Sequence, residues 1–237
     1  MTSVNAGMEI LALDTSTQWL SVALFDGQRA IALRERVGSG ASERILPAIG
    51  EMLARDGTSL ANLDGIAYGA GPGSFTGVRI ACGVAQGLAF GSGKPLFGVS
   101  TLEAIAQSAW RAHGWQRIVA CLDARMHEVY VAAYERKHNG WTIDREPVVG
   151  KPDAIEPMTA EDWHGAGDGF IAYPALAARL GLVDCDGAII PDAQSIAECA
   201  WPQVLAGRGV SADEAQPLYV RHRVALTSAE RASGARL

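Results

Sequence analysis

The sequence predicts an α/β protein built from two related halves. Strand-like runs and amphipathic helical patterns follow one another along the chain. The segment 68–93 has the order buried strand, glycine turn, helix, which aims the free amide groups of a helix start at the edge of a sheet. From Arg117 the pattern of the first hairpin recurs, as expected of a duplicated fold whose second half has become irregular.

Composition and charge limit the function. The 237 residues are 49% hydrophobic and 19% charged, which is enough apolar material for a large core. The formal net charge of −6 argues against nucleic acid binding by this chain alone. The end of the chain is an exception, because residues 216–237 carry four arginines and one glutamate.

Several classes of protein are not expected. No run of about 18 apolar residues is present, so we expect no transmembrane helix and no membrane partner. The first seven residues do not resemble a signal peptide, and the four cysteines form no C-x-x-C pair, which is typical of a cytoplasmic protein with reduced thiols. The five histidines include no i, i+4 pair, so we predict no metal site, and there is no G-x-S-x-G hydrolase turn.

The first half begins with a predicted meander and a helix. Apolar alternation between Asp- and Gly-containing turns predicts strands over 10–13, 19–25 and 30–37. An amphipathic helix follows over 43–55, and Pro47 predicts that it starts near Arg44 or is kinked there. Its predicted apolar face consists of Ile45, Leu46, Ile49 and Leu53.

The glycine turn comes next, between a strand over 64–68 and a helix from Phe75. Its spacing fits neither the Walker loop nor the dinucleotide fingerprint. Two interpretations stay open: an anion on the amides of residues 74–77, or a tight turn in which glycine permits close backbone packing. The candidates for a phosphate or nucleotide turn are Asp14, Thr15, Ser16, Gly71, Gly73, Ser74, Thr76 and Gly77.

The helix after the turn is apolar on two sides. One stripe at helical spacing contains Val78, Ala81, Cys82, Ala85, Leu88 and Ala89, and a second contains Ile80, Val84, Gly87 and Gly91. Such a helix must be covered on more than one side, and its small residues allow close approach. The cover is either the rest of this fold or a second protein.

The remaining elements are predicted in the same way. A strand over 95–99 and a helix over 101–111 end the first half. With an offset of 109, Asp123 falls on Asp14, Val131 on Val22 and Tyr134 on Phe25. Later predictions are a strand over 141–149, a loop or short helix over 152–157, a turn at Gly165, Gly167 and Gly169, a helix over 174–180, a strand over 189–190 and a helix over 192–206.

Two halves that each open with an Asp-led hairpin turn resemble the actin and sugar-kinase superfamily, with its ribonuclease H-like fold. The resemblance implies that both hairpin turns face ATP phosphates. Here the turns at Asp14 and Asp123 lack the glycines of those kinases, so a self-sufficient ATP site is not expected. The predicted division is 1–112 for the first half, 113–215 for the degenerate second half, and 216–237 for a tail that packs back on the first half and is then disordered.

The motifs L-A-L-D-T-S-T, G-P-G-S-F-T-G-V-R-I, L-D-A-R-M-H-E-V-Y and P-L-Y-V-R stand in the order found in the TsaB (YeaZ) family, which this chain resembles. The resemblance implies a non-catalytic accessory subunit that dimerises with a TsaD-like catalytic subunit in making N6-threonylcarbamoyladenosine in tRNA. It also implies a TsaE-like ATPase as third partner, tRNA contact only through the complex, and a homodimer when alone. No cofactor of its own is expected, with ATP or ADP at the partner interface.

The resemblance places the partner interface on the helices of the first half. The candidates are Ile45, Leu46, Ile49, Phe75, Val78, Arg79, Cys82 and Gln86. For Arg79, pairing with a carboxylate of the partner and with one of its own chain both stay open. Many relatives have His where Ala41 stands here, which alters any contact that this His makes.

Two alternatives belong to other classes. An ATP-dependent small-molecule kinase of the same superfamily would use Asp14 and Asp123 to hold metal and nucleotide, although its turn glycines are missing. A peptidase is suggested only by an old label of relatives, and no nucleophile–base pair supports it.

Overall fold

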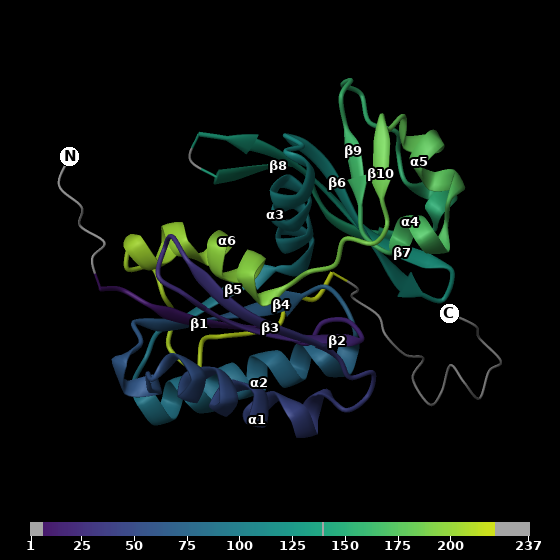
Figure 1. Cartoon of the computed structure of the whole chain (residues 1–237). Helices are drawn as coiled ribbons and strands as arrows, with labels where there is room; N and C mark the ends of the chain where they lie inside the picture. Colours follow the sequence, from purple (N-terminus) through teal and green to yellow (C-terminus); the bar gives the residue numbers. More distant parts are fainter. Residues whose placement is uncertain (1–6, 139, 221–237) are drawn as a thin grey trace, which may run out of the picture.

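The computed structural model describes residues 7–138 and 140–220, which form two mixed α/β halves (Figure 1). The strands of the first half are β1 (Ile10–Asp14), β2 (Trp19–Phe25), β3 (Ala30–Arg36), β4 (Gly65–Gly71) and β5 (Leu96–Ser100). Those of the second are β6 (Arg117–Arg125), β7 (Glu128–Lys137), β8 (Gly140–Gly150), β9 (His164–Ala166) and β10 (Asp184–Asp186). The helices are α1 (Ala41–Asp56), α2 (Phe75–Ser92), α3 (Thr101–His113), α4 (Gly169–Ala172), α5 (Ala175–Leu180) and α6 (Ala193–Leu205), with 3-10 turns at Leu60–Asn62 and Pro152–Ala154.

The two sheets have the same strand order. The first is β3-β2-β1-β4-β5, and the second, β10-β9-β6-β7-β8, repeats that order when counted from its other edge. In each, the three strands of the meander are antiparallel and the later two are parallel to the first strand. The mixed α/β class is therefore confirmed, and the common order is what a duplicated fold would produce.

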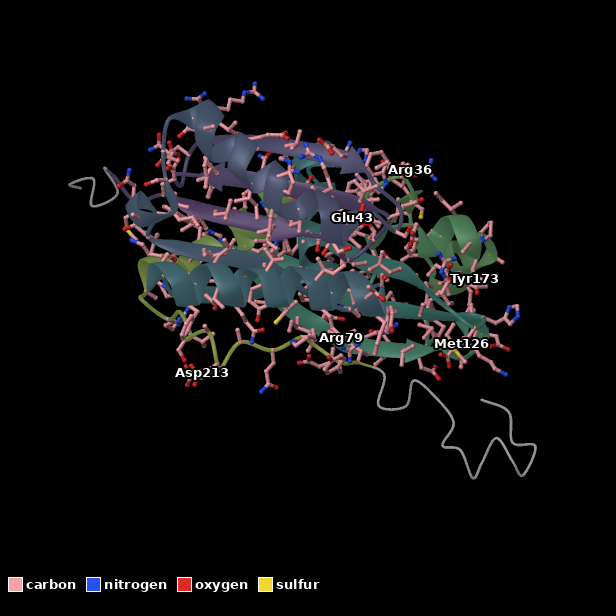
Figure 2. The ribbon with its side chains drawn as sticks, turned by 90° about the horizontal axis from the view of Figure 1, so that it is seen from below. Arg36, Glu43, Arg79, Met126, Tyr173 and Asp213 are labelled. Atoms are coloured by element: carbon pink, nitrogen blue, oxygen red, sulfur yellow. The ribbon has the colours of Figure 1, made fainter. Side chains whose placement is uncertain are left out.

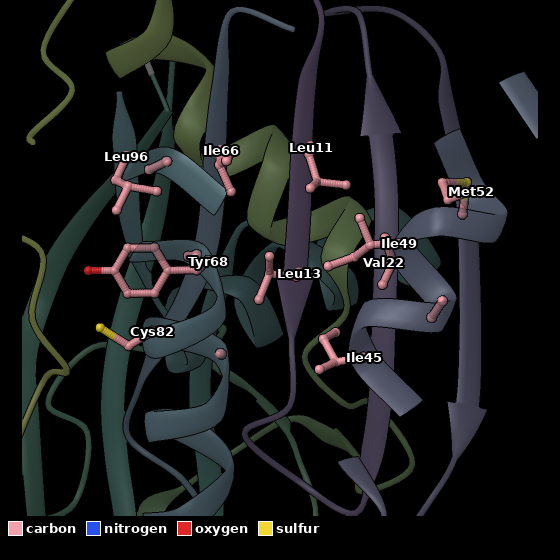
Figure 3. Packing of buried hydrophobic residues seen from close by; sticks show 14 of the residues in the cluster. Leu11, Leu13, Val22, Ile45, Ile49, Met52, Ile66, Tyr68, Cys82 and Leu96 are labelled. Carbon is pink, nitrogen blue, oxygen red and sulfur yellow. The ribbon is translucent and has the colours of Figure 1, made fainter. Parts of the chain in front are cut away.

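Helices cover both faces of the first sheet. Helices α1 and α2 pack on one face, where Leu11, Leu13 and Val22 meet Ile45 and the rest of the buried cluster in Figure 3. Helix α6 packs on the opposite face, where Trp201 meets Phe25 edge-on. In the second half, α3 covers one face of the sheet, and α4 and α5 cover the other.

The predicted repeat is out of register by one residue in its second strand. Leu13 pairs with Val22 in the first hairpin, whereas Leu122 pairs with Tyr130 in the second. The offset of 109 fits the first strands, but the second hairpin has one residue fewer between paired positions. Val22 therefore corresponds to Tyr130, not to Val131, and a one-residue slip reverses which face of the sheet a side chain occupies.

Other element predictions also need correction. Strand β4 continues through Gly69 to Gly71, so the glycines do not break it where expected. Helix α1 begins at Ala41, six residues before the exposed Pro47, since solvent can satisfy the carbonyl that this proline leaves without a donor. The predicted strand over 189–190 is absent, and β10 lies earlier, paired with β9, which contains Gly165.

Residues 207–220, here named the C-terminal strap, return to the first half. Val210 exchanges two 2.9 Å backbone hydrogen bonds with Leu96, and Leu218 donates its amide to the carbonyl of Ala70 at 2.7 Å. Helix α6, placed by sequence in the range 113–215, also packs on the first sheet. That predicted range is therefore not one body in space, and the predicted disorder of the tail concerns residues 221–237, outside the described chain. No helix among the described residues is long and apolar enough to span a membrane.

Candidate functional site

A cleft of about 630 Å³ lies between the two halves. Its walls are the turn after β1, the start of α2, the turn after β6 and the end of the C-terminal strap. The first half lines the cleft with hydroxyl side chains: Thr15, Ser16, Thr17, Ser39, Ser74 and Thr76. The second half lines it with the charged side chains of Asp123, Arg125 and Asp168. The fold therefore brings the turns that follow Asp14 and Asp123 to the same cleft.

Close backbone packing explains the glycines at the start of α2. A Cβ on Gly77 would lie 1.9 Å from the carbonyl oxygen of Thr15, and one on Gly73 would lie 2.5 Å from that of Ser16. Thr15 donates its hydroxyl to the carbonyl of Gly77 at 2.6 Å. The turn after β1 thus rests directly on the start of α2, which only residues without a side chain permit.

This packing uses much of the predicted anion site. The amide of Ser74 donates to the carbonyl of Ser16 at 2.7 Å, and the amide of Gly77 points at the hydroxyl of Ser74, which caps α2. Of the four amides of residues 74–77, only those of Phe75 and Thr76 have no acceptor among the described residues. Of the two interpretations, the structure favours the tight turn, and Gly71, with φ +104, lies against Leu218 of the strap.

A pair of glycine substitutions tests this packing. Gly77→Ala is expected to destabilise the protein by roughly 1–3 kcal/mol, because the added methyl overlaps the carbonyl of Thr15. Gly83→Ala, in the same helix, meets nothing within 4 Å and is expected to stabilise it by up to about 1 kcal/mol. Chemical denaturation of both purified variants measures the difference, and equal stabilities would contradict the packing role.

Asp14 lies behind the cleft and is buried. Its Oδ2 accepts hydrogen bonds from the amide and hydroxyl of Ser16, whereas its Oδ1 has no hydrogen-bond partner among the described residues and lies against Gly69. Burial raises the pKa of Asp14 to about 7, and the nearby Asp192 adds to the rise. The carboxyl group therefore shapes the turn and does not line the cleft.

In the second half, the glycines that follow β9 pack against Cys121 of β6. A Cβ on Gly167 would lie 2.1 Å from the carbonyl oxygen of Cys121, and one on Gly169 would lie 2.3 Å from its Sγ. Asp123 is engaged locally, since it accepts from the amide of Arg125 at 2.9 Å and pairs with its guanidinium. These glycines thus serve packing around Cys121. Among residues 7–138 and 140–220, no three His, Cys, Asp or Glu side chains are placed to hold a metal ion.

Half of the predicted interface residues are buried in the chain's own core. Ile45, Ile49, Val78 and Cys82 are between 0% and 4% exposed, and they pack beneath the sheet. They cannot contact a partner on the surface, so this part of the interface prediction is wrong. The error has a simple cause: the most apolar side chains of an amphipathic helix face its own core.

The other predicted interface residues reach the surface. Leu46 and Phe75 are each 54% exposed, and Arg79 of α2, labelled in Figure 2, is exposed as well. Gln86 is half-buried and donates to the carbonyls of Ala212 and Ala215, so it holds the C-terminal strap against α2.

The open side of α2 is marked by residues that the interface prediction omitted. A Cβ at Gly83, Gly87 or Gly91 would meet nothing within 4 Å, and Phe90 is 86% exposed. Gly50 of α1 is open in the same way. The second apolar stripe of α2 was the signal that could have identified this side. We give the name docking face to eight exposed residues of the two helices: Leu46, Gly50, Phe75, Arg79, Gly83, Gly87, Phe90 and Gly91.

Comparison with known proteins places the chain in a family. Residues 35–215 match the family model described as TsaD: tRNA N6-adenosine threonylcarbamoyltransferase. The chain is 42% identical over 223 residues to the tRNA threonylcarbamoyladenosine biosynthesis protein TsaB of Escherichia coli, covering 92% of this chain and 96% of the relative. The TsaB protein of Haemophilus influenzae is 38% identical over 226 residues, covering 92% and 95%.

A solved structure agrees with these relatives. YeaZ from Pseudomonas aeruginosa is 39% identical to this chain, with a TM-score of 0.83, over 90% of this chain and 99% of the other. Likeness in sequence and in fold thus extends over nearly the whole length of both partners in each comparison. The chain belongs to the TsaB (YeaZ) family.

Proposed function

We propose that this chain is a non-catalytic subunit that pairs with a TsaD-like catalytic subunit in making N6-threonylcarbamoyladenosine in tRNA. Family membership supports the pathway, since relatives carry the name of threonylcarbamoyladenosine biosynthesis proteins. The observation that carries the pairing is the open docking face. A helix with three uncovered glycines and a phenylalanine that is 86% exposed leaves apolar surface that a second protein can bury.

Two features of the cleft support an accessory role over the kinase alternative. The space beside Gly73 and Gly77, at the start of α2, is occupied by the carbonyls of Ser16 and Thr15. The space beside the glycines of the second half is occupied by Cys121. Kinases of the resembled superfamily keep such space for phosphates and adenosine. Any ATP or ADP is therefore expected at the interface with the partner, where the second protein and a TsaE-like ATPase complete the site.

A reconstitution assay tests the proposal. This chain, a TsaD-family subunit, a TsaE-family ATPase, tRNA, ATP and the threonylcarbamoyl precursors are mixed, and modified adenosine is measured after nuclease digestion with each component omitted in turn. Modification is expected to require this chain together with the TsaD-family subunit. This chain alone is expected to form no product and to release no phosphate from ATP.

Binding is measured separately from turnover, by analytical ultracentrifugation of this chain with and without the TsaD-family subunit. A 1:1 complex is expected in the mixture and a self-associated species in its absence. Turnover by the isolated chain, or full modification in its absence, would contradict the accessory role.

A further inference from the structure

Arg79 stands on the docking face between two exposed aromatic rings. Its guanidinium carbon lies 3.3 Å from the centre of the Phe75 ring and 5.1 Å from that of Tyr219. One guanidinium nitrogen donates to the carbonyl of Phe75 at 3.3 Å. Phe75 and Tyr219 are 54% and 53% exposed, so the cation is held in place by rings that themselves face solvent.

The charge of Arg79 is not balanced locally. Among the described residues no carboxylate lies within ion-pair distance of its guanidinium, although Arg44, Arg111 and Arg117 each have such a partner. The first turn of α2 contains no acidic residue. Arg79 is the fifth residue of α2 and lies beyond the first turn, so a favourable interaction with the helix dipole does not explain an arginine at this position.

The surroundings of Arg79 attract a negative group. The amides of Phe75 and Thr76 at the start of α2 have no acceptor in the described chain, and Phe75 and Thr76 line the mouth of the cleft. Leu218, 40% exposed, lies in the strap beside Tyr219. The result is a small electropositive point with an apolar rim, on a chain whose formal net charge is −6.

We propose that Arg79, with Phe75 and Tyr219, binds an acidic side chain of the partner protein that covers the docking face. This inference rests on the proposed function, since the partner is the TsaD-like subunit, and it adds the C-terminal strap to the interface through Tyr219. A guanidinium whose orientation is already fixed by aromatic rings forms a carboxylate pair with little loss of side-chain entropy. Arginine and tyrosine in such positions are typical of the residues that dominate binding energy.

A protein carboxylate fits this point better than an RNA phosphate. One face of the Phe75 ring is covered by the guanidinium at 3.3 Å, so less of the ring is left for stacking a base. The formal net charge of −6 also argues against a phosphate-binding surface, because RNA-binding surfaces collect several cations. The apolar rim and its continuity with the open glycines of α2 match a protein surface.

The test measures the dissociation constant of this chain for the TsaD-family subunit by isothermal titration calorimetry. Arg79→Glu and Arg79→Gln are each expected to weaken binding by roughly 30-fold or more, with Glu the weaker binder. Tyr219→Ala is expected to weaken it by a smaller factor. The control Lys151→Glu, an exposed site on the second half with the same change of charge, is expected to bind like the wild type.

The outcomes separate the two proposals. If the wild type does not bind the TsaD-family subunit, the proposed function fails. If the wild type binds and Arg79→Glu binds equally well, the pairing of Arg79 with the partner is overturned while the proposed function stands. If Arg79→Glu binds the subunit normally but the complex loses affinity for tRNA, the anion is a phosphate, and the inference is overturned in favour of RNA.

Discussion

Asp14→Asn is expected to make the protein more stable at pH 8, by an amount that disappears as the pH falls towards 4. Asp14 is 1% exposed, its Oδ1 has no hydrogen-bond donor within residues 7–138 and 140–220, and its pKa rises from 3.8 to about 7 on folding. Between pH 3.8 and 7 folding therefore takes up a proton, and above pH 7 it buries a charge. Asparagine keeps the shape of the side chain and can still accept from Ser16 through its Oδ1.

The sign and the pH window follow from linkage. A carboxyl group whose pKa is raised in the folded state does not destabilise the protein below pH 3.8, where it is protonated in both the folded and the unfolded chain. The destabilisation grows as the pH rises from 3.8 to about 7. Each pH unit between these two pKa values lowers the free energy of unfolding by about 1.4 kcal/mol. Over the whole range the destabilisation is on the order of 4 kcal/mol, and the substitution removes it. Urea denaturation from pH 4.5 to 8.5 should show the two proteins diverging and then running parallel.

Asp26 is the matched control, because its carboxylate has the opposite environment. It accepts hydrogen bonds from the amides of Gln28 and Arg29 at an exposed turn, which lowers its pKa. Its contribution is present above pH 3.8 and is lost as the pH falls through the lower folded pKa, so Asp26→Asn should destabilise at neutral pH. A constant difference between Asp14→Asn and the wild type at every pH would contradict the buried charge.

The sequence predicted those parts of the fold that depend on local pattern. The first hairpin and the start of α2 at Phe75 agree with the structure, because alternation, turn residues and a serine cap are all local signals. The prediction ended strand β4 before Gly69, because glycine weakens a strand, whereas the strand continues to Gly71. What keeps glycine there is the carboxylate of Asp14, from a distant part of the chain.

The proposed docking face was harder to predict for the same physical reason. Hydrophobicity identifies residues that avoid water, and in α1 and α2 these are core residues such as Ile45 and Val78. The open side is defined by what is missing, namely neighbours of Gly83 and Gly87, and this is visible only in three dimensions. Tyr219 could not be connected with Arg79 in advance, because a strap 140 positions later in the chain brings them together.

Gly83→Glu is expected to abolish pairing with the TsaD-family subunit while leaving this chain folded. A Cβ at Gly83 meets nothing within 4 Å among the described residues, so the isolated chain should accommodate the glutamate with little change in melting temperature. At an interface the same carboxylate would be buried without a partner, which costs several kcal/mol and thus weakens binding by a factor of a hundred or more. Calorimetric titration gives the affinity, and thermal denaturation gives the stability.

Ala178→Glu, on an exposed helix of the second half, is the control and should bind normally. A graded series at Gly83 then distinguishes close packing from electrostatic repulsion. If the glycines let a partner helix approach closely, Gly83→Ala should already weaken binding, although it stabilises the free chain, and Gly83→Leu should weaken it further without any charge. Were alanine and leucine to bind as tightly as glycine, the open side of α2 would not be a contact surface, and the pairing would have to involve another face of the molecule.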